Sequence, residues 1–364
     1  MMFNKDSDKY YFLVELFYHA MVGDRKMLEQ VLWQDGMQGI SLEEADKDGQ
    51  TALMAAVTAG NMDTAQLLVE YGANVNAMDN DAYDVPNKGT PLQRSIYCGL
   101  LGMMGLLLEN GADPNLRRQP DMMTPLMLAV FMRNHAMVDL LLDHGADVNA
   151  VQERAISETA LSTAAYKGDF ALVQRLLKAG ATIKDSQTAL IWAGRDNDYA
   201  EDQRENYASI TGLLLEAGAN INAQDVYGRT ALMMVCGETL RSSASAVKFL
   251  LEQGADVNLR SRSGDSALGC AARGDDNAVV RLLLKAVAQV NTGDEEGRTP
   301  LMWASRGANI EIMQMLLDAG ADASLEDKEG NMAADFAEEL DDAQEKTEAL
   351  SLLYHHFSTI ENQC

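Results

Sequence analysis

Residues 124–150 read TPLMLAVFMRNHAMVDLLLDHGADVNA. This segment has a Thr-Pro-Leu start, two apolar runs and a Gly-Ala-Asp-Val-Asn end, with no obvious catalytic group. A segment this short cannot bury its own apolar faces, because burial requires a second packed layer. The segment therefore predicts that other parts of the chain cover it.

The same segment recurs along the chain. Its opening Thr or Ser is found at Thr51, Thr90, Thr124, Thr159, Thr188, Thr230, Ser266 and Thr299. Its closing glycine is found at Gly72, Gly111, Gly145, Gly180, Gly218, Gly254 and Gly320. Spacings of 29 to 42 residues between successive openings indicate a repeat array, which covers residues 46–331.

Each repeat has the local signals of a helix pair. The opening Thr offers a side-chain oxygen that caps a helix, and the Pro or Ala after it suits the first helical turn. A second helix carries a Leu pair such as Leu176 and Leu177, and the closing Gly ends it in a left-handed conformation. An Asp- and Gly-rich turn then leads to the next repeat. Stacking of such pairs buries their apolar faces.

These recurring motifs resemble the ankyrin repeat family over nearly the whole chain. The resemblance implies an all-α ankyrin-repeat solenoid of stacked helix–turn–helix units with β-hairpin fingers. One position departs from the family, which usually has His three residues after the opening Thr. That position holds Met54, Gln93, Met127, Ser162, Ile191, Met233, Gly269 and Met302. We expect methionine packing to replace the hydrogen bonds of the missing histidines.

Three regions are expected. Residues 1–45 form an N-terminal cap with a degenerate helix pair over residues 10–32, residues 46–331 form about eight repeats, and residues 332–364 form an acidic capping helix pair. The acidic face between Glu338 and Glu348 suits the polar outer surface that a terminal repeat requires.

Several repeats are irregular. The connection over residues 79–89 is about six residues longer than the others, which predicts an extended finger, while residues 180–188 are about four residues short, which predicts a missing hairpin. Residues 194–209 add an insertion between two helices, a feature that maps either to a binding face or to repeat drift without function. The seventh repeat has Gly269 within a helix and Val287 in place of the closing glycine, and we expect it to open first.

Composition excludes several classes of protein. A net charge of −26 disfavours nucleic-acid binding, and the acidity serves either solubility or a basic partner. No apolar run approaches about 20 residues, so no membrane span is expected. Four widely spaced cysteines indicate free thiols, and the start of the chain lacks the features of a signal peptide. We expect a cytoplasmic protein, with export by a signal-less route left open.

No motif for catalysis, cofactor binding or metal binding is present in the sequence. There is no phosphate-binding loop, no zinc-spaced Cys and His set and no nucleophile elbow. Asp79, Asp81 and Asp84 lack the glycine that a calcium loop of the EF-hand type needs. Neither a cofactor nor a metal is expected.

Recognition residues come from the resemblance. It implies that the seventh and eighth residues after each opening Thr line a concave binding face. The candidate partner-binding residues are Tyr97, Phe131, Met132, Tyr166, Lys167, Arg195, Arg273 and Arg306. Aromatic residues, Met and Arg are enriched in interface cores. The alternative for the arginines is that they only neutralise Asp196, Asp275 and Glu311. Trp192 and Trp303, four residues after their Thr, are expected to pack between repeats.

The sequence thus favours a monomeric, non-catalytic adaptor or scaffold that binds another protein on its concave face. One alternative is an inhibitor or immunity-type protein that masks the active site of its partner. Another is an enzyme whose site has no recognisable motif.

Overall fold

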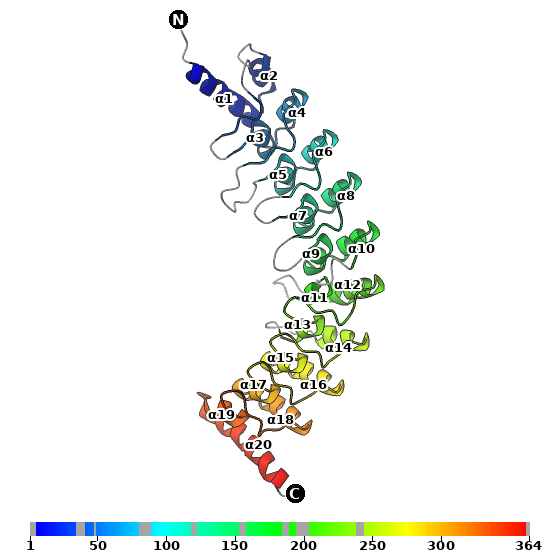
Figure 1. The fold of residues 1–364 in the computed structure, drawn as a ribbon, viewed down its shortest axis with the longest axis vertical. Coiled ribbons are helices and arrows are strands. Elements are labelled where there is room, and N and C mark those ends of the chain that lie inside the picture. The colour runs from blue at the N-terminus through cyan, green and yellow to red at the C-terminus, as the bar shows by residue number, and fades with distance from the viewer. Residues whose placement is uncertain are drawn as a thin grey trace. The chain divides into compact units, whose positions relative to one another are not determined.

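The computed structural model describes residues 5–33, 41–46, 49–79, 89–117, 122–152, 158–183, 189–193, 204–237 and 244–361. Within these ranges the chain folds into α-helices joined by turns, and the only β-type pairings are isolated bridges between Gln152 and Glu158 and between Arg260 and Ser266 (Figure 1). The fold is therefore all-α, as the repeats predict. The expected hairpin fingers are present as tight turns without regular strands.

The chain forms two compact units, the first made of residues 1–164 and 178–181, the second of residues 165–177 and 182–364. The first contains α1 (Lys5–Val22), α2 (Arg25–Trp33), α3 (Ala52–Thr58), α4 (Met62–Glu70), α5 (Pro91–Tyr97), α6 (Leu101–Glu109), α7 (Pro125–Phe131) and α8 (His135–Asp143). Two helices, α9 (Ala160–Tyr166) and α10 (Phe170–Lys178), have residues in both units. The second contains α11 (Ala189–Ala193), α12 (Arg204–Glu216), α13 (Ala231–Gly237), α14 (Ala244–Glu252), α15 (Ala267–Arg273), α16 (Asn277–Lys285), α17 (Pro300–Arg306), α18 (Ile310–Asp318), α19 (Ala333–Glu338) and α20 (Ala343–Glu361).

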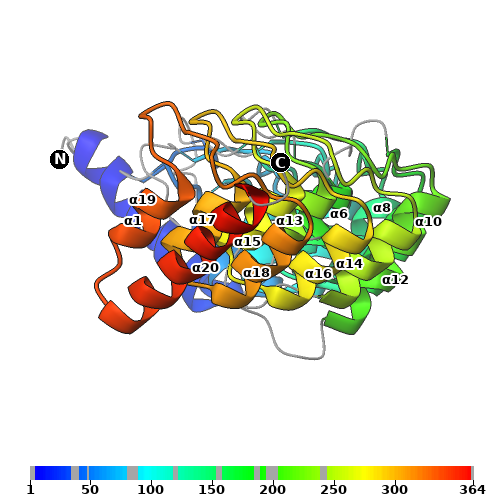
Figure 2. The ribbon, with the colours of Figure 1, turned by 90° about the horizontal axis from the view of Figure 1, so that it is seen from below.

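Helices pack in two rows within each unit. In the first unit α1, α3, α5 and α7 contact one another in succession, and so do α2, α4, α6 and α8. The second unit repeats this order from α11 to α19 and from α12 to α20. Figure 2 shows the two rows of the second unit, with the fingers on the side of the odd-numbered helices. Leu53, Leu126 and Leu301, which follow the opening Thr by two residues, are at most 1% exposed, so this stacking forms the core.

The helix-start signals act as predicted. The side chains of Thr51, Thr90, Thr124, Ser266 and Thr299 accept a hydrogen bond from the backbone N–H three residues later. Each odd-numbered helix with such a cap therefore starts at the residue after its Thr or Ser.

The expectation for the missing histidines is confirmed in part. Met54, Met127 and Met302 are buried at their positions. Gln93 differs from these methionines, because its side chain makes hydrogen bonds instead of apolar contacts alone. Its side chain accepts from the Thr90 N–H (3.0 Å) and donates to the Leu116 carbonyl in the following repeat (3.0 Å).

Asparagines of the Val-Asn closing signal connect successive repeats. The Asn76 side chain donates to the Gly111 carbonyl (3.0 Å) and accepts from the Asp113 N–H (2.8 Å) of the next repeat. The same donation to a closing-glycine carbonyl is made by Asn115, Asn149 and Asn291. Each bond satisfies a carbonyl at a helix end, where no intrahelical partner exists.

A finger aspartate closes most turns before a helix. The carboxylate of Asp294 accepts from the Arg298 N–H (2.9 Å), the residue just before the Thr299 cap. Asp46, Asp79, Asp225 and Asp327 make the equivalent bond in their fingers. Asp79 accepts this bond from the Gly89 N–H, which lies ten residues later in the chain. The bond therefore closes the base of the long finger.

Backbone bonds also join neighbouring fingers of the second unit. The N–H of Arg262 donates to the Tyr227 carbonyl, and the N–H of Glu295 donates to the Ser263 carbonyl, both at 2.8 Å. Gly264 at one finger tip has a φ of +74°, and a Cβ there would lie 2.8 Å from the Glu295 nitrogen. Both the backbone conformation and the close approach thus require glycine at this tip.

Three irregularities can be compared with the structure. Residues 204–209 belong to α12, which is 13 residues long against nine for α14, so the prediction of a loop over residues 194–209 was wrong for its second part. The first part of that insertion lies outside the described residues. The same is true of residues 184–188 in the short connection and of residues 80–88 in the long finger. Val287 has a φ of 61°, which confirms the left-handed conformation expected at the end of α16.

Candidate protein-binding surface

Most of the candidate residues lie where their helices end. Tyr97, Phe131, Tyr166, Arg273 and Arg306 are the last residues of α5, α7, α9, α15 and α17, and Met132 caps α7. Short odd-numbered helices of seven residues place their final side chain next to the following turn rather than in the stack. Arg195 lies outside the described residues.

In the first unit the most accessible candidates are Phe131 and Met132, which are 48% and 45% exposed. Tyr97, in the preceding repeat, is half-buried. Because α5 and α7 pack against each other, these side chains belong to neighbouring repeats of one row. They provide an apolar and aromatic surface.

Tyr166 and Lys167, in the second unit, are less accessible than Phe131 and Met132. Lys167 is only 8% exposed, and its ammonium group lies 5.7 Å from the centroid of the Tyr166 ring. The Tyr166 ring in turn meets Trp192 edge to face at 5.5 Å. Lys167 therefore offers little surface to a partner. Trp192 packs against the preceding repeat, as predicted.

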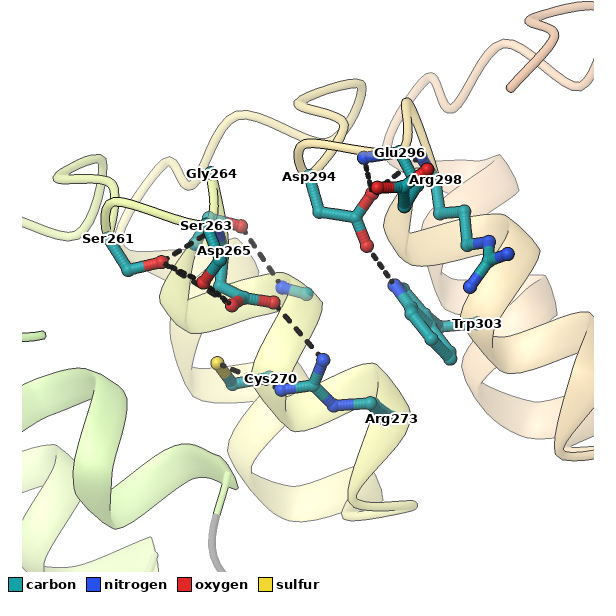
Figure 3. A network of polar contacts seen from close by, with 12 residues as sticks. Ser261, Ser263, Gly264, Asp265, Cys270, Arg273, Asp294, Glu296, Arg298 and Trp303 are labelled. Carbon is teal, nitrogen blue, oxygen red and sulfur yellow. Dashed lines mark hydrogen bonds and ion pairs between the residues drawn. The ribbon is translucent and has the colours of Figure 1, made fainter. Parts of the chain in front are cut away.

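The structure brings Arg273 and Arg306 together around Trp303. Their guanidinium carbons lie 5.2 and 5.9 Å from the centroid of the indole, and Arg298 lies at 5.5 Å. In the view of Figure 3, Arg273 and Arg298 lie on either side of the half-buried indole. Distances below about 6 Å are typical of cation–π contact. We call Trp303, Arg273, Arg298 and Arg306 the arginine–tryptophan cluster.

Carboxylates hold three members of this cluster in place. Asp294 accepts a hydrogen bond from the indole N–H of Trp303 (3.2 Å). Asp265 binds Arg273 at 3.1 Å and also accepts from the Ser263 hydroxyl at 2.7 Å (Figure 3). Asp327 lies 3.8 Å from the Arg298 Nε. The cluster is therefore positioned by the fingers on which these aspartates lie.

Arg306 differs from the other two arginines. It is exposed, and among the described residues it forms a cation–π contact but no ion pair. The carboxylates that were the expected neutralising partners bind elsewhere. Glu311 pairs with Arg281 at 2.8 Å, and Asp275 accepts from Asn309. Asp196 lies outside the described residues.

Arg298 was missed by the sequence reasoning. It directly precedes the Thr299 cap, in a Gly-Arg-Thr sequence that also occurs at residues 228–230. Arg229 also lies near an aromatic ring, 4.9 Å from the centroid of Tyr227. The repeated Gly-Arg-Thr was thus an available signal for an arginine that stacks on an aromatic ring.

Outside this cluster, Asp79 and Cys236 are both buried within the fold. The Asp79 carboxylate binds Arg94 and the Gly89 N–H. Burial raises the pKa of the Cys236 thiol, with a further contribution from Cys270 and Asp276. A thiol with a raised pKa is a poor nucleophile. No helix in the described part of the chain combines the length and apolar character that a membrane crossing needs.

Comparisons with known proteins agree with this architecture. A family model of ankyrin repeats matches residues 16–118, 84–152, 126–201 and 239–327. An ankyrin repeat and KH domain-containing protein of Caenorhabditis briggsae is 28% identical over 275 residues, which are 73% of this chain and 9% of that protein. A putative E3 ubiquitin-protein ligase of Arabidopsis thaliana is 41% identical over 78 residues, 21% of this chain and 20% of that protein.

The chain thus spans a fifth or less of the length of these two relatives. Among solved structures, the human ASB11 ankyrin repeat domain superposes with a TM-score of 0.50 at 22% identity, covering 66% of this chain and 98% of that domain. This likeness concerns the fold. With the family match extending over more than half of its residues, the chain belongs to the ankyrin repeat family.

Proposed function

We propose that the chain is a non-catalytic protein-interaction module that binds its partner at the ends of its odd-numbered helices. The observation that carries this proposal is the arginine–tryptophan cluster, in which one half-buried indole is surrounded by three guanidinium groups. Tryptophan and arginine are the residue types most enriched among the side chains that dominate binding energy.

The cluster suits recognition of a carboxylate-bearing partner. A guanidinium that stacks on an indole keeps its in-plane N–H donors directed outward, and such a fork matches a carboxylate in a bidentate manner. Arg306 has these donors free of any ion pair among the described residues. Because Asp265 and Asp294 already fix Arg273 and Trp303, binding would lose little side-chain entropy at these two positions.

The first unit offers an apolar candidate surface of its own. Phe131 and Met132 offer exposed aromatic and thioether groups, which bind by contact rather than by charge.

The comparisons support only the general role. The two relatives carry, by their names, a KH domain or a ubiquitin ligase activity. We assign to this chain the recognition role of the shared repeats and none of those activities. The free thiols of Cys98, Cys236 and Cys270 support a reducing compartment such as the cytoplasm.

Differential capture tests the proposal. The parent chain, Arg306→Glu and Arg281→Glu are immobilised, and the proteins that each retains from a lysate are quantified by mass spectrometry. Arg281 is the matched control, because it is an exposed arginine on an even-numbered helix. We expect at least one protein to be retained by the parent and by Arg281→Glu but lost by Arg306→Glu. Identical sets from all three, with unchanged thermal unfolding, would contradict the proposal.

A further inference from the structure

The first helix exposes a continuous row of large apolar side chains. Six residues of α1 form this row, which we call the α1 stripe: Tyr10 (72% exposed), Tyr11 (68%), Val14 (47%), Tyr18 (53%), Met21 (55%) and Val22 (54%). With 3.6 residues per turn they all fall within about 120° of the helix circumference. The stripe is therefore one face and not a set of scattered residues.

The opposite face of α1 is packed against neighbouring helices. Leu16 and Ala20 are fully buried there, and α1 packs against α2 and α3. A helix that is apolar on both sides is typical of a position covered from both sides. The far end of the array differs, because Tyr354 is the only strongly exposed large apolar residue among the described side chains of α19 and α20.

Charge makes the α1 end suitable for contact with another copy. From residue 5 to residue 33 there are five acidic and four basic residues, a net charge of −1, in a chain whose net charge is −26. From residue 333 to residue 361 there are eight acidic residues and one lysine, a net charge of −7. Two copies therefore repel each other less through α1 than through the C-terminal helix pair, since like charges placed face to face oppose association.

Glu15, a carboxylate beside the α1 stripe, is hydrogen-bonded within the helix. Glu15 lies 2.8 Å from the His19 Nε2 and shares a hydrogen bond with the Tyr11 hydroxyl. A partner that covers the stripe would therefore meet a carboxylate that already has hydrogen-bond partners.

The size of the stripe fits a homodimer. Its side chains expose about 500 Å² of largely apolar surface, in the upper part of the roughly 300–600 Å² of the largest patch on a typical monomer and of the order of the roughly 800 Å² that each partner of a standard interface buries. A stripe of one chemistry along one helix is self-complementary, as the two-fold contact of a homodimer requires.

We propose that the α1 stripe is the interface of a homodimer in which α1 of one copy packs against α1 of a second copy. This replaces the monomer that the sequence led us to expect. The proposal is independent of the arginine–tryptophan cluster, which lies in the second unit.

Sedimentation velocity of the full chain tests it. The parent should shift from monomer to dimer between about 1 and about 100 µM, and the dissociation constant should fall as salt screens the negative charge of the two copies. Tyr18→Glu should raise that constant at least about tenfold. The matched control is Tyr354→Glu, since Tyr354 is exposed to the same 53% on α20, and it should leave the constant unchanged.

Three results would overturn the proposal. The first is a parent that remains monomeric at the highest concentration. The second is a dimer that Tyr18→Glu leaves intact while its thermal unfolding matches that of the parent. The third is a monomeric parent that co-sediments with phosphatidylcholine vesicles, which would assign the stripe to a membrane surface instead.

Discussion

Arg94 and Trp303 occupy the same place in their repeats but serve different purposes. Each lies four residues after its opening Thr, and each donates a hydrogen bond to the finger aspartate, Asp79 at 2.5 Å and Asp294 at 3.2 Å. Arg94 is 2% exposed, whereas Trp303 is half-buried. A side chain that reaches the finger aspartate thus fixes the finger in both units.

The difference lies in what remains for a partner. Arg94 also donates to the Thr58 hydroxyl and the Gly89 carbonyl, so its charge is used within the fold. Trp303 donates only its indole N–H, and its ring lies within cation–π distance of Arg273 and Arg306. The same position therefore helps to close the base of the long finger in the first unit, whereas in the second unit it holds the indole of the proposed recognition cluster.

The largest expected effect comes from breaking the buried pair. Arg94→Ala should destabilise the first unit by about 3–5 kcal/mol, because it leaves the Asp79 carboxylate buried without its partner. Urea unfolding followed by circular dichroism measures this loss. The double variant Arg94→Ala with Asp79→Ala should recover part of it. A loss below about 1 kcal/mol for Arg94→Ala would show that the Arg94–Asp79 pair contributes little to the stability of the first unit.

Removing the Trp303 indole should have a smaller effect on stability than removing Arg94. Trp303→Ala should destabilise the second unit by about 2 kcal/mol, roughly half the loss for a fully buried tryptophan, because the indole is half-buried. The same unfolding measurement applies, with Tyr227→Ala as a control at an exposed aromatic residue. If Trp303→Ala proved more damaging than Arg94→Ala, the contrast between the two positions would be wrong.

The repeat that carries Arg273 should gain stability from one substitution. Val287→Gly should stabilise it by about 1 kcal/mol, because Val287 is 80% exposed and held at a φ of 61°, which glycine adopts without strain. Hydrogen exchange of α15 and α16 should slow accordingly. Val287→Ala is the control and should give no such gain. Exchange in the parent that is as slow in α16 as in α8 would refute the expectation that this repeat opens first.

The smallest expected effect is the dependence of stability on acidic pH through Asp327. Burial alone would raise the pKa of Asp327, but hydrogen bonds from Asn331 and Glu329 and the charge of Arg298 lower it below its ordinary value of 3.8. A carboxyl whose pKa is lowered on folding contributes stability above its unfolded pKa and loses that contribution as the pH falls through the folded value. The stability difference between the parent and Asp327→Asn should therefore be present at pH 7 and shrink below about pH 4. A difference independent of pH would exclude the ionised form as its source.

The sequence was sufficient where the signals are local. Thr299 caps the helix that follows it, and the glycines that close repeats adopt a positive φ, because both depend on a few adjacent residues. It was insufficient for side chains whose setting depends on a finger or a neighbouring repeat. The burial of Lys167 and the hydrogen bonds of Gln93 both follow from packing that no short pattern encodes. The Gly-Arg-Thr sequence marks Arg298, but it does not show that Trp303 is the ring beside it.

The central claim is that the arginine–tryptophan cluster binds a carboxylate-bearing protein partner. Its most direct test is the affinity for a partner found by differential capture, measured by titration calorimetry with the parent, Arg306→Ala and Arg281→Ala at low and high salt. We predict that Arg306→Ala weakens binding at low salt by about 1–2 kcal/mol, that salt reduces this difference, and that Arg281→Ala binds like the parent. Equal affinities for the parent and Arg306→Ala at both salt concentrations would contradict the claim.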